Sequence, residues 1–183
     1  MADLNTLAST NFKLQYLKKI LAIILLMKYL LIALVLLFSA CSVKDYKQTQ
    51  SKVIIIKSPK IKFADLGYIR NSDSSIELEL FIAGKSVKKI AINHLICVDE
   101  GCMSKSGFNK DYLNHSYPNE LMQNLLLSKP IYDGLNLEKT DDGFVQNIKN
   151  EYVDIKYNVD SKTTFFKDRK NKIIFKIKDT VKG

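Results

Sequence analysis

The chain has 183 residues, of which 46% are hydrophobic and 26% are charged, and its formal net charge is +9. This length accommodates one globular domain with a real core and leaves little room for a second. The sequence contains no nucleic-acid-binding module and no interleaved basic and aromatic motif, so we expect no nucleic-acid partner in spite of the basic charge.

An apolar segment near the N-terminus ends on small residues and a cysteine. Lys28 is followed by the apolar run 29–38 and then by Ser39, Ala40 and Cys41. A positive start, an apolar stretch and a small-residue cleavage site are the three parts of a secretory signal, and they occur here in order. The end of the segment resembles the lipobox of bacterial lipoproteins, with Phe38 in place of the usual leucine. We predict cleavage before Cys41 and lipidation of Cys41 by a diacylglycerol and a palmitate-like acyl chain, with no other cofactor.

The alternative for this segment is a transmembrane helix. Residues 20–40 are interrupted only by Lys28 and Ser39 and are long enough to span about 30 Å of hydrocarbon. A lysine near the middle of a span costs roughly 2.5 to 3.5 kcal/mol, whereas directly after Met27 it supplies the positive start of a signal. We therefore assign 27–40 to the signal peptide and 1–26 to a non-essential upstream extension. Ser42 resembles the sorting residue of outer-membrane lipoproteins.

The predicted mature chain, residues 41–183, keeps a basic excess of six, because residues 1–40 contain four lysines and one aspartate. Its first part, 41–51, is polar and without periodicity, which is typical of a tether between the lipid and a fold. The domain, 52–183, begins with a β-branched run. Period-two alternation predicts strands at 53–56, 61–69, 76–82, 87–98, 130–132, 143–148 and 152–159, followed by a hairpin of 163–167 and 172–178.

One segment of the domain has helical spacing. Leu121, Met122, Leu125 and Leu126 predict a short helix within 118–127, with a possible turn before it at 109–113. Many short strands with one inserted helix favour an antiparallel sandwich over alternating strand and helix units. The expected fold class is therefore mainly β, an antiparallel β-sandwich with one short inserted helix.

Two cysteines remain once Cys41 is assigned to lipid. Cys97 and Cys102 are expected to form a disulfide, because exported proteins meet an oxidising compartment. A zinc site is the alternative, since His94 and His115 could complete a set of four ligands with the cysteines. The histidine that would complete a zinc-finger spacing is missing, because Asn119 stands at its position. We therefore predict the disulfide and no metal.

Tyr112, Tyr117 and Tyr132 gather around the cysteine loop and the predicted helix. Core packing is one explanation for these rings, and a partner surface is the other. The sequence has no Gly-x-Ser-x-Gly nucleophile motif and no glycine-rich phosphate loop, so we expect no enzyme.

Several local sequence words point to a group of proteins. The signal, the stretches Phe63–Tyr68 and 97–105, Phe108-Asn109 and Tyr117-Pro118 resemble small exported lipoproteins of epsilon-class proteobacteria. The resemblance implies an immunoglobulin-like β-sandwich on an outer-membrane lipid anchor, and it transfers no functional residue except Cys41.

The expected function is a non-enzymatic binding or adhesion domain, anchored to the membrane by lipid, with an envelope protein or a host glycan as partner. A periplasmic accessory or assembly factor that docks on another envelope protein through a strand edge is the main alternative. An envelope hydrolase is a minor one.

Overall fold

The computed structural model describes residues 18–30, 46–99 and 101–180, which belong to two separate units of the chain, 1–44 and 45–183. In the first unit, residues 18–30 form a helix that includes Lys28 and is exposed along its whole length. Among the described residues, no helix combines the length and the apolar character needed to cross a membrane. The predicted cleavage site and Cys41 lie outside the described residues.

The second unit consists of eleven strands and three short helical segments. The strands form one sheet in the order β6-β5-β4-β3-β2-β1-β11-β10-β9-β8-β7, and every pairing is antiparallel. Their bounds are β1 Gln48–Lys57, β2 Lys62–Asn71, β3 Ile76–Ile82, β4 Lys85–Ile92, β5 Ile96–Val98, β6 Gly101–Met103, β7 Leu137–Lys139, β8 Phe144–Lys149, β9 Asp154–Val159, β10 Thr163–Asp168 and β11 Ile173–Asp179.

The predicted mainly β, antiparallel class is confirmed, and the two-sheet sandwich is not seen. The first strand, β1, pairs with β2 on one side and with the last strand, β11, on the other, so the hydrogen-bonded ladder runs through the sheet without a break. The sheet is not closed, since β6 and β7 are its two edges. Alternation reveals which face of a strand is buried, but it carries no information about which strands pair.

Several predicted boundaries differ from the structure. β1 starts at Gln48, so four residues assigned to the tether belong to the sheet. The long run 87–98 is two strands, β4 and β5, joined by a turn, and the short strands β6 and β7 were not predicted. The strand predicted at 130–132 is wrong, because Tyr132 and Asp133 adopt positive φ angles and Tyr132–Gly134 forms the 3-10 turn η1.

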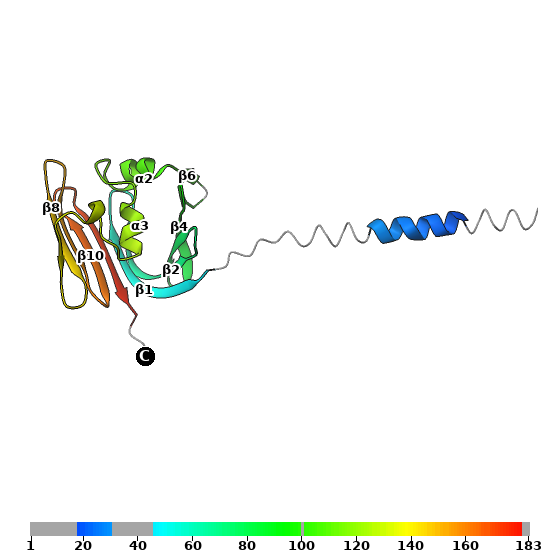
Figure 1. Ribbon diagram of the computed structural model, residues 1–183, viewed down its shortest axis with the longest axis horizontal. Coiled ribbons are helices and arrows are strands. Elements are labelled where there is room, and N and C mark those ends of the chain that lie inside the picture. Colours follow the sequence, from blue (N-terminus) through cyan, green and yellow to red (C-terminus); the bar gives the residue numbers. More distant parts are fainter. Residues whose placement is uncertain (1–17, 31–45, 100, 181–183) are drawn as a thin grey trace, which may run out of the picture. The chain divides into compact units, whose positions relative to one another are not determined.

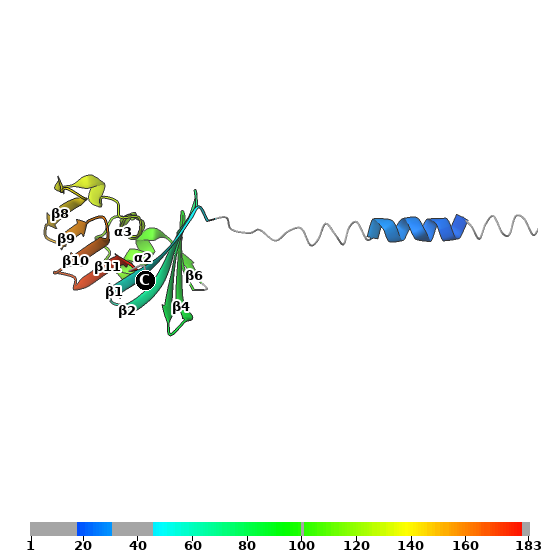
Figure 2. The same ribbon diagram turned by 90° about the horizontal axis from the view of Figure 1, so that it is seen from below.

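Two helices lie between the two arms of the sheet, β1–β6 and β8–β11 (Figures 1 and 2). The predicted helix is confirmed as α3, Leu121–Leu126, whose four buried side chains are the apolar residues that predicted it. The preceding helix, α2, Lys105–Tyr112, begins earlier than the predicted turn. Ser104 caps α2 by accepting a hydrogen bond from the amide of Gly107 at 3.0 Å.

The core fills the space between the sheet and the helices. Inward side chains such as Ile54, Leu78 and Ile90 are at most 1% exposed, and α3 packs against β3. At the other arm, Phe166 meets the rings of Tyr117, Tyr157 and Phe175 edge-on, with centroids 6.0 to 6.3 Å apart. These aromatic pairs join the α2–α3 connection to β9, β10 and β11.

A buried carboxylate fixes the same connection to the β10–β11 turn. Asp168 is fully buried and accepts hydrogen bonds from the Tyr117 hydroxyl and the Asn171 side-chain amide, each at 2.7 Å. It also accepts from the backbone amides of Asp154, Lys170 and Asn171. Burial acts to raise the pKa of Asp168, but these hydrogen bonds outweigh it and hold the pKa below its ordinary value.

The start of the domain is held on the outer face of the sheet. Tyr46 donates a hydrogen bond to Glu77 at 2.7 Å, and its ring lies 5.9 Å from the guanidinium carbon of Arg70. Arg70 in turn pairs with Glu77 at 3.1 Å and with Glu79 at 2.7 Å. Partial burial and the neighbouring Glu77 raise the pKa of Tyr46 to about 12, so the hydroxyl remains a donor.

Candidate functional site

A cleft of about 650 Å³ opens at the end of the sheet where several elements meet. The first residues of β1, the β2–β3 turn, the end of β4 and the end of α3 form its walls. A cleft of this volume is within the usual range for small-ligand sites.

The cleft has an apolar floor and a polar rim. Ile69, Ile76, Ile92 and Leu126 line it and are at most 7% exposed. Amide and hydroxyl side chains surround this floor, contributed by Gln48, Gln50, Asn71, Ser72, Ser74, Ser75, Asn93, Gln123 and Ser128. An aliphatic floor with a rim of neutral hydrogen-bonding groups suits a ligand that has both methyl groups and neutral polar groups.

Asn71 is the residue in this cleft with an unused hydrogen-bonding atom. Its side-chain oxygen is buried and has no hydrogen-bond partner among the described residues. Asn71 lies at the end of β2, opposite Gln48 in the β1–β2 register, and both residues line the cleft. Leaving a buried acceptor unpaired costs roughly 1 to 3 kcal/mol, so a donor supplied by a ligand recovers that energy.

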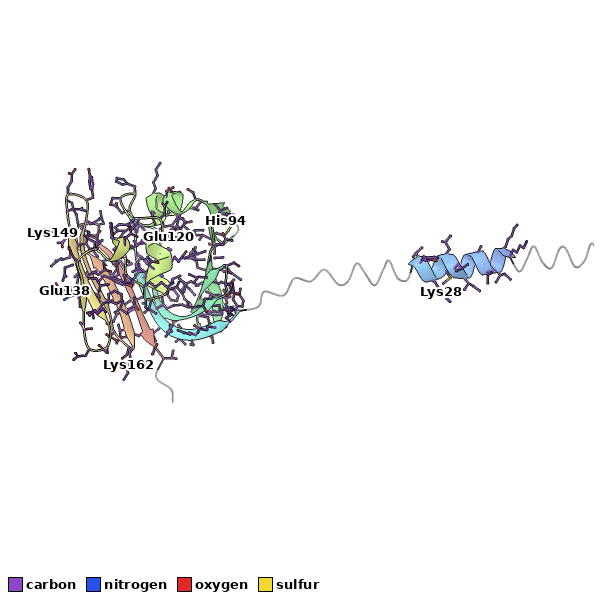
Figure 3. The ribbon with its side chains drawn as sticks, viewed as in Figure 1. Lys28, His94, Glu120, Glu138, Lys149 and Lys162 are labelled. Atoms are coloured by element: carbon purple, nitrogen blue, oxygen red, sulfur yellow. A yellow bond between two sulfur atoms is a disulfide. The ribbon has the colours of Figure 1, made fainter. Side chains whose placement is uncertain are left out.

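Charge contributes little to this cleft. Asp73 and Lys129 are the charged residues that line it, and Asp73 pairs with Lys47 in an exposed ion pair. Neither histidine nor cysteine is among the described lining residues. His94 lies in the β4–β5 turn (Figure 3), and His115 lies in the α2–α3 connection. The cleft therefore offers mainly neutral hydrogen-bonding groups and apolar contact, with Asp73 and Lys129 as its charged side chains.

The predicted disulfide is present between Cys97 and Cys102, which face each other in the β5–β6 hairpin. Nearby, Asp99 accepts a hydrogen bond from Lys88 at 2.7 Å, and this bond lowers the pKa of Asp99. Within the part of the chain that the structure describes, no three His, Cys, Asp or Glu side chains gather as a metal site would require. The two cysteine sulfurs that the alternative zinc site would need as ligands are bonded to each other.

The three tyrosines of the predicted partner surface lie in different surroundings. Tyr117 is 5% exposed and its hydroxyl bonds Asp168, so it is not available to a partner. Tyr132 packs against the core, and burial raises its pKa to about 12. Tyr112 is half-buried and stacks on Phe108, with Lys60 over its ring. Core packing, the other explanation of these rings, fits all three, because Tyr117 belongs to the core and Tyr112 and Tyr132 are partly buried against it.

The cleft was not predicted from the sequence. Gln48 and Gln50 were assigned to the tether, although they continue the parity of the inward residues Ile54 and Ile56. This alternation was the sequence pattern that could have placed both glutamines on the inner face of the sheet. The other walls come from turns far apart in the chain, and no local pattern brings them together.

Comparison with known proteins gives no relative: no protein-family model, no curated protein and no solved structure matches this chain.

Proposed function

We propose that this chain is a lipid-anchored, non-enzymatic binding protein of the bacterial outer membrane, and that the cleft beside Asn71 holds its ligand. The observation that carries the proposal is the unpaired, buried oxygen of Asn71 in a cleft with an aliphatic floor. An N-acetylated glycan matches this chemistry. Its amide N–H donates to an acceptor, its methyl group fits the floor, and its hydroxyls match the Gln and Ser rim.

The anchor is proposed from the segment 27–42. Its order of lysine, apolar run, small residues and cysteine supports cleavage before Cys41 and acylation of Cys41. Two acyl signals are needed for stable membrane attachment, and a lipoprotein cysteine provides them.

An assembly factor that docks through a strand edge is the second candidate. The open edges of β6 and β7 support it, because an edge strand presents unpaired backbone groups to a partner strand. Each edge strand has three residues, which limits the number of main-chain hydrogen bonds that such a partner could form.

The cleft is tested with neutral N-acetylglucosamine oligomers of two to six units, titrated into the purified protein by calorimetry and by amide chemical shifts. We expect shifts at Gln50 and Asn71 and an affinity that Asn71→Leu lowers by about 10- to 100-fold, the equivalent of one buried hydrogen bond. The same variant should not destabilise the ligand-free protein, since the side-chain oxygen of Asn71 has no hydrogen-bond partner among the described residues.

Asn147→Leu is the matched control, because Asn147 is an exposed asparagine on β8 outside the cleft. It should bind the oligomers as the unchanged protein does. Absence of shifts at the cleft with every oligomer would refute the glycan proposal, and a loss of stability in Asn71→Leu would show that the residue has a structural role instead.

The anchor is tested by intact mass and by labelling cells with an alkynyl fatty acid. The expected product begins at Cys41 and carries acyl chains, and Cys41→Ser abolishes the label. Protease treatment of intact cells then separates an adhesin, which is cut, from a periplasmic accessory factor, which is protected.

A further inference from the structure

The outer face of β9–β11 and β1 carries lysines that point away from the core. Inward residues of these strands, such as Phe166 and Phe175, are at most 1% exposed, so their neighbours in sequence face outward. We define the lysine face by its five outward lysines, which are Lys57, Lys156, Lys167, Lys176 and Lys178. In Figure 3, Glu138 on β7 and Lys149 on β8 mark the side of the neighbouring strands that lies away from α3.

The strand register places these lysines beside one another. Lys167 lies directly opposite Lys156 on β9 and opposite Ile174 on β11, and Ile174 lies opposite Lys57 on β1. In the next row Phe165 stands between Lys176 and Asn158. Like charges directly opposite each other in a sheet repel, so the Lys156 and Lys167 pair costs stability unless an anion lies against it.

Within the described residues, the lysine face has no internal neutralisation. None of its five lysines has a carboxylate within ion-pair distance, whereas Lys47, Lys52, Lys88, Lys89 and Lys105 on other parts of the domain do. The outward carboxylates of β7–β11 are Glu138 and Asp154. Asp154 is already paired with Arg169 at 2.9 Å.

A shallow groove of about 430 Å³ lies in the middle of this face. Phe165 and Val145 are half-buried in its lining, and Lys156, Lys176, Asn158 and Thr163 contribute polar groups around them. Lysine stems can lie along such apolar surface while their ammonium groups reach an anionic layer. The groove thus combines positive charge with shallow apolar contact.

We propose that the lysine face docks on an anionic phospholipid surface, with lipid phosphates seated between Lys156, Lys167 and Lys176. The proposal rests in part on the lipid anchor of the proposed function. Cys41 precedes Tyr46 by five residues, and Tyr46 is bonded to Glu77 on β3, outside the arm of β8–β11 that carries most of the lysine face. Five extended residues reach at most about 18 Å, so an anchored domain lies against the bilayer.

The test places the purified protein, in the N-terminal form that cells produce, on nanodiscs of phosphatidylglycerol or of phosphatidylcholine. Brief lysine acetylation followed by mass spectrometry then reports which amines are covered. A lysine near an anionic membrane surface gains about 1 kcal/mol, which corresponds to about fivefold. We therefore expect acetylation of Lys156, Lys167 and Lys176 to slow about fivefold on phosphatidylglycerol discs. Lys110 on α2 should be unchanged, and high salt should remove the protection.

Two double variants complete the test. Lys156→Gln with Lys176→Gln removes two charges from the lysine face, and protection at Lys178 should then fall to the level of Lys110. Lys85→Gln with Lys110→Gln removes two charges elsewhere and should leave the protection intact. Equal acetylation on both disc types, or protection that the control pair abolishes equally, would overturn the proposal. Intact mass reports the acyl chains separately, so a missing anchor and an uninvolved lysine face give different results.

Discussion

Replacing Tyr117 with phenylalanine removes one hydrogen bond from the buried carboxylate of Asp168 and leaves the ring in place. The bond is 2.7 Å long and its acceptor is charged, and such bonds contribute about 1.5 to 3 kcal/mol to stability. Because the other donors to Asp168 remain, we expect a loss of about 2 kcal/mol at pH 7. For a domain of this size that corresponds to a fall in Tm of about 6 °C.

The stability lost in Tyr117→Phe should depend on pH. The folded pKa of Asp168 is depressed, so its stabilising contribution is complete above the unfolded pKa of about 4 and is lost as the pH falls through the folded pKa. Tyr117→Phe raises the folded pKa of Asp168 towards its ordinary value. The difference in Tm between the unchanged protein and the variant should therefore shrink as the pH falls from 7 to 3.

Thermal unfolding followed by circular dichroism at pH 7, 5, 4 and 3 measures both effects. Tyr152→Phe is the matched control, because Tyr152 is 53% exposed, and it should leave Tm unchanged. A Tyr117→Phe variant with an unchanged Tm at pH 7, or with a deficit that stays constant down to pH 3, would refute the role assigned to the carboxylate.

Three further changes have expected outcomes. Replacing Cys97 and Cys102 together with serine opens a six-residue loop and should lower the free energy of unfolding, measured in urea, by about 2 kcal/mol. In the unchanged domain, thiol labelling under denaturing, unreduced conditions should find neither Cys97 nor Cys102 reactive. Gly143→Ala would place its Cβ 1.9 Å from the carbonyl oxygen of Val159 and should destabilise by more than about 2 kcal/mol, visible as reduced Tm; normal stability would show that the two strands separate easily there. Ser104→Ala removes the α2 cap and should cost about 1 kcal/mol, whereas Ser104→Asp should restore it; equal losses in both would argue against capping.

Local patterns predicted some elements well because those elements depend on local chemistry. β3 alternates apolar and acidic residues, and its apolar residues Ile76, Leu78 and Leu80 are buried as expected, whereas Ile82 at the end of the strand is exposed. The β10–β11 hairpin was predicted from its polar turn, where Asp168 indeed bonds the amides of Lys170 and Asn171. α3 shows its four apolar residues at helical spacing and buries all four.

Other features depend on contacts between distant segments and could not be predicted from local sequence patterns. α2 contains Gly107 and buries Phe108 and Asn109, so its sequence shows no apolar stripe. Asn109 donates to the carbonyls of Tyr117 and Pro118, and this contact holds the helix against the next segment. The walls of the cleft and the pairing of β1 with β11 are likewise decided by tertiary structure.

The central position of β1 has a consequence for the order in which the domain is made. Lys52 of β1 lies opposite Asp179 of β11, so the first strand to emerge during synthesis has to wait for the last one. Contacts of such sequence separation slow folding, and each arm alone would leave apolar inner-face residues uncovered. The sheet therefore cannot be completed until nearly the whole chain has been delivered. For the export proposed above, this delay is an advantage, since the domain cannot complete its sheet before β11 has been made.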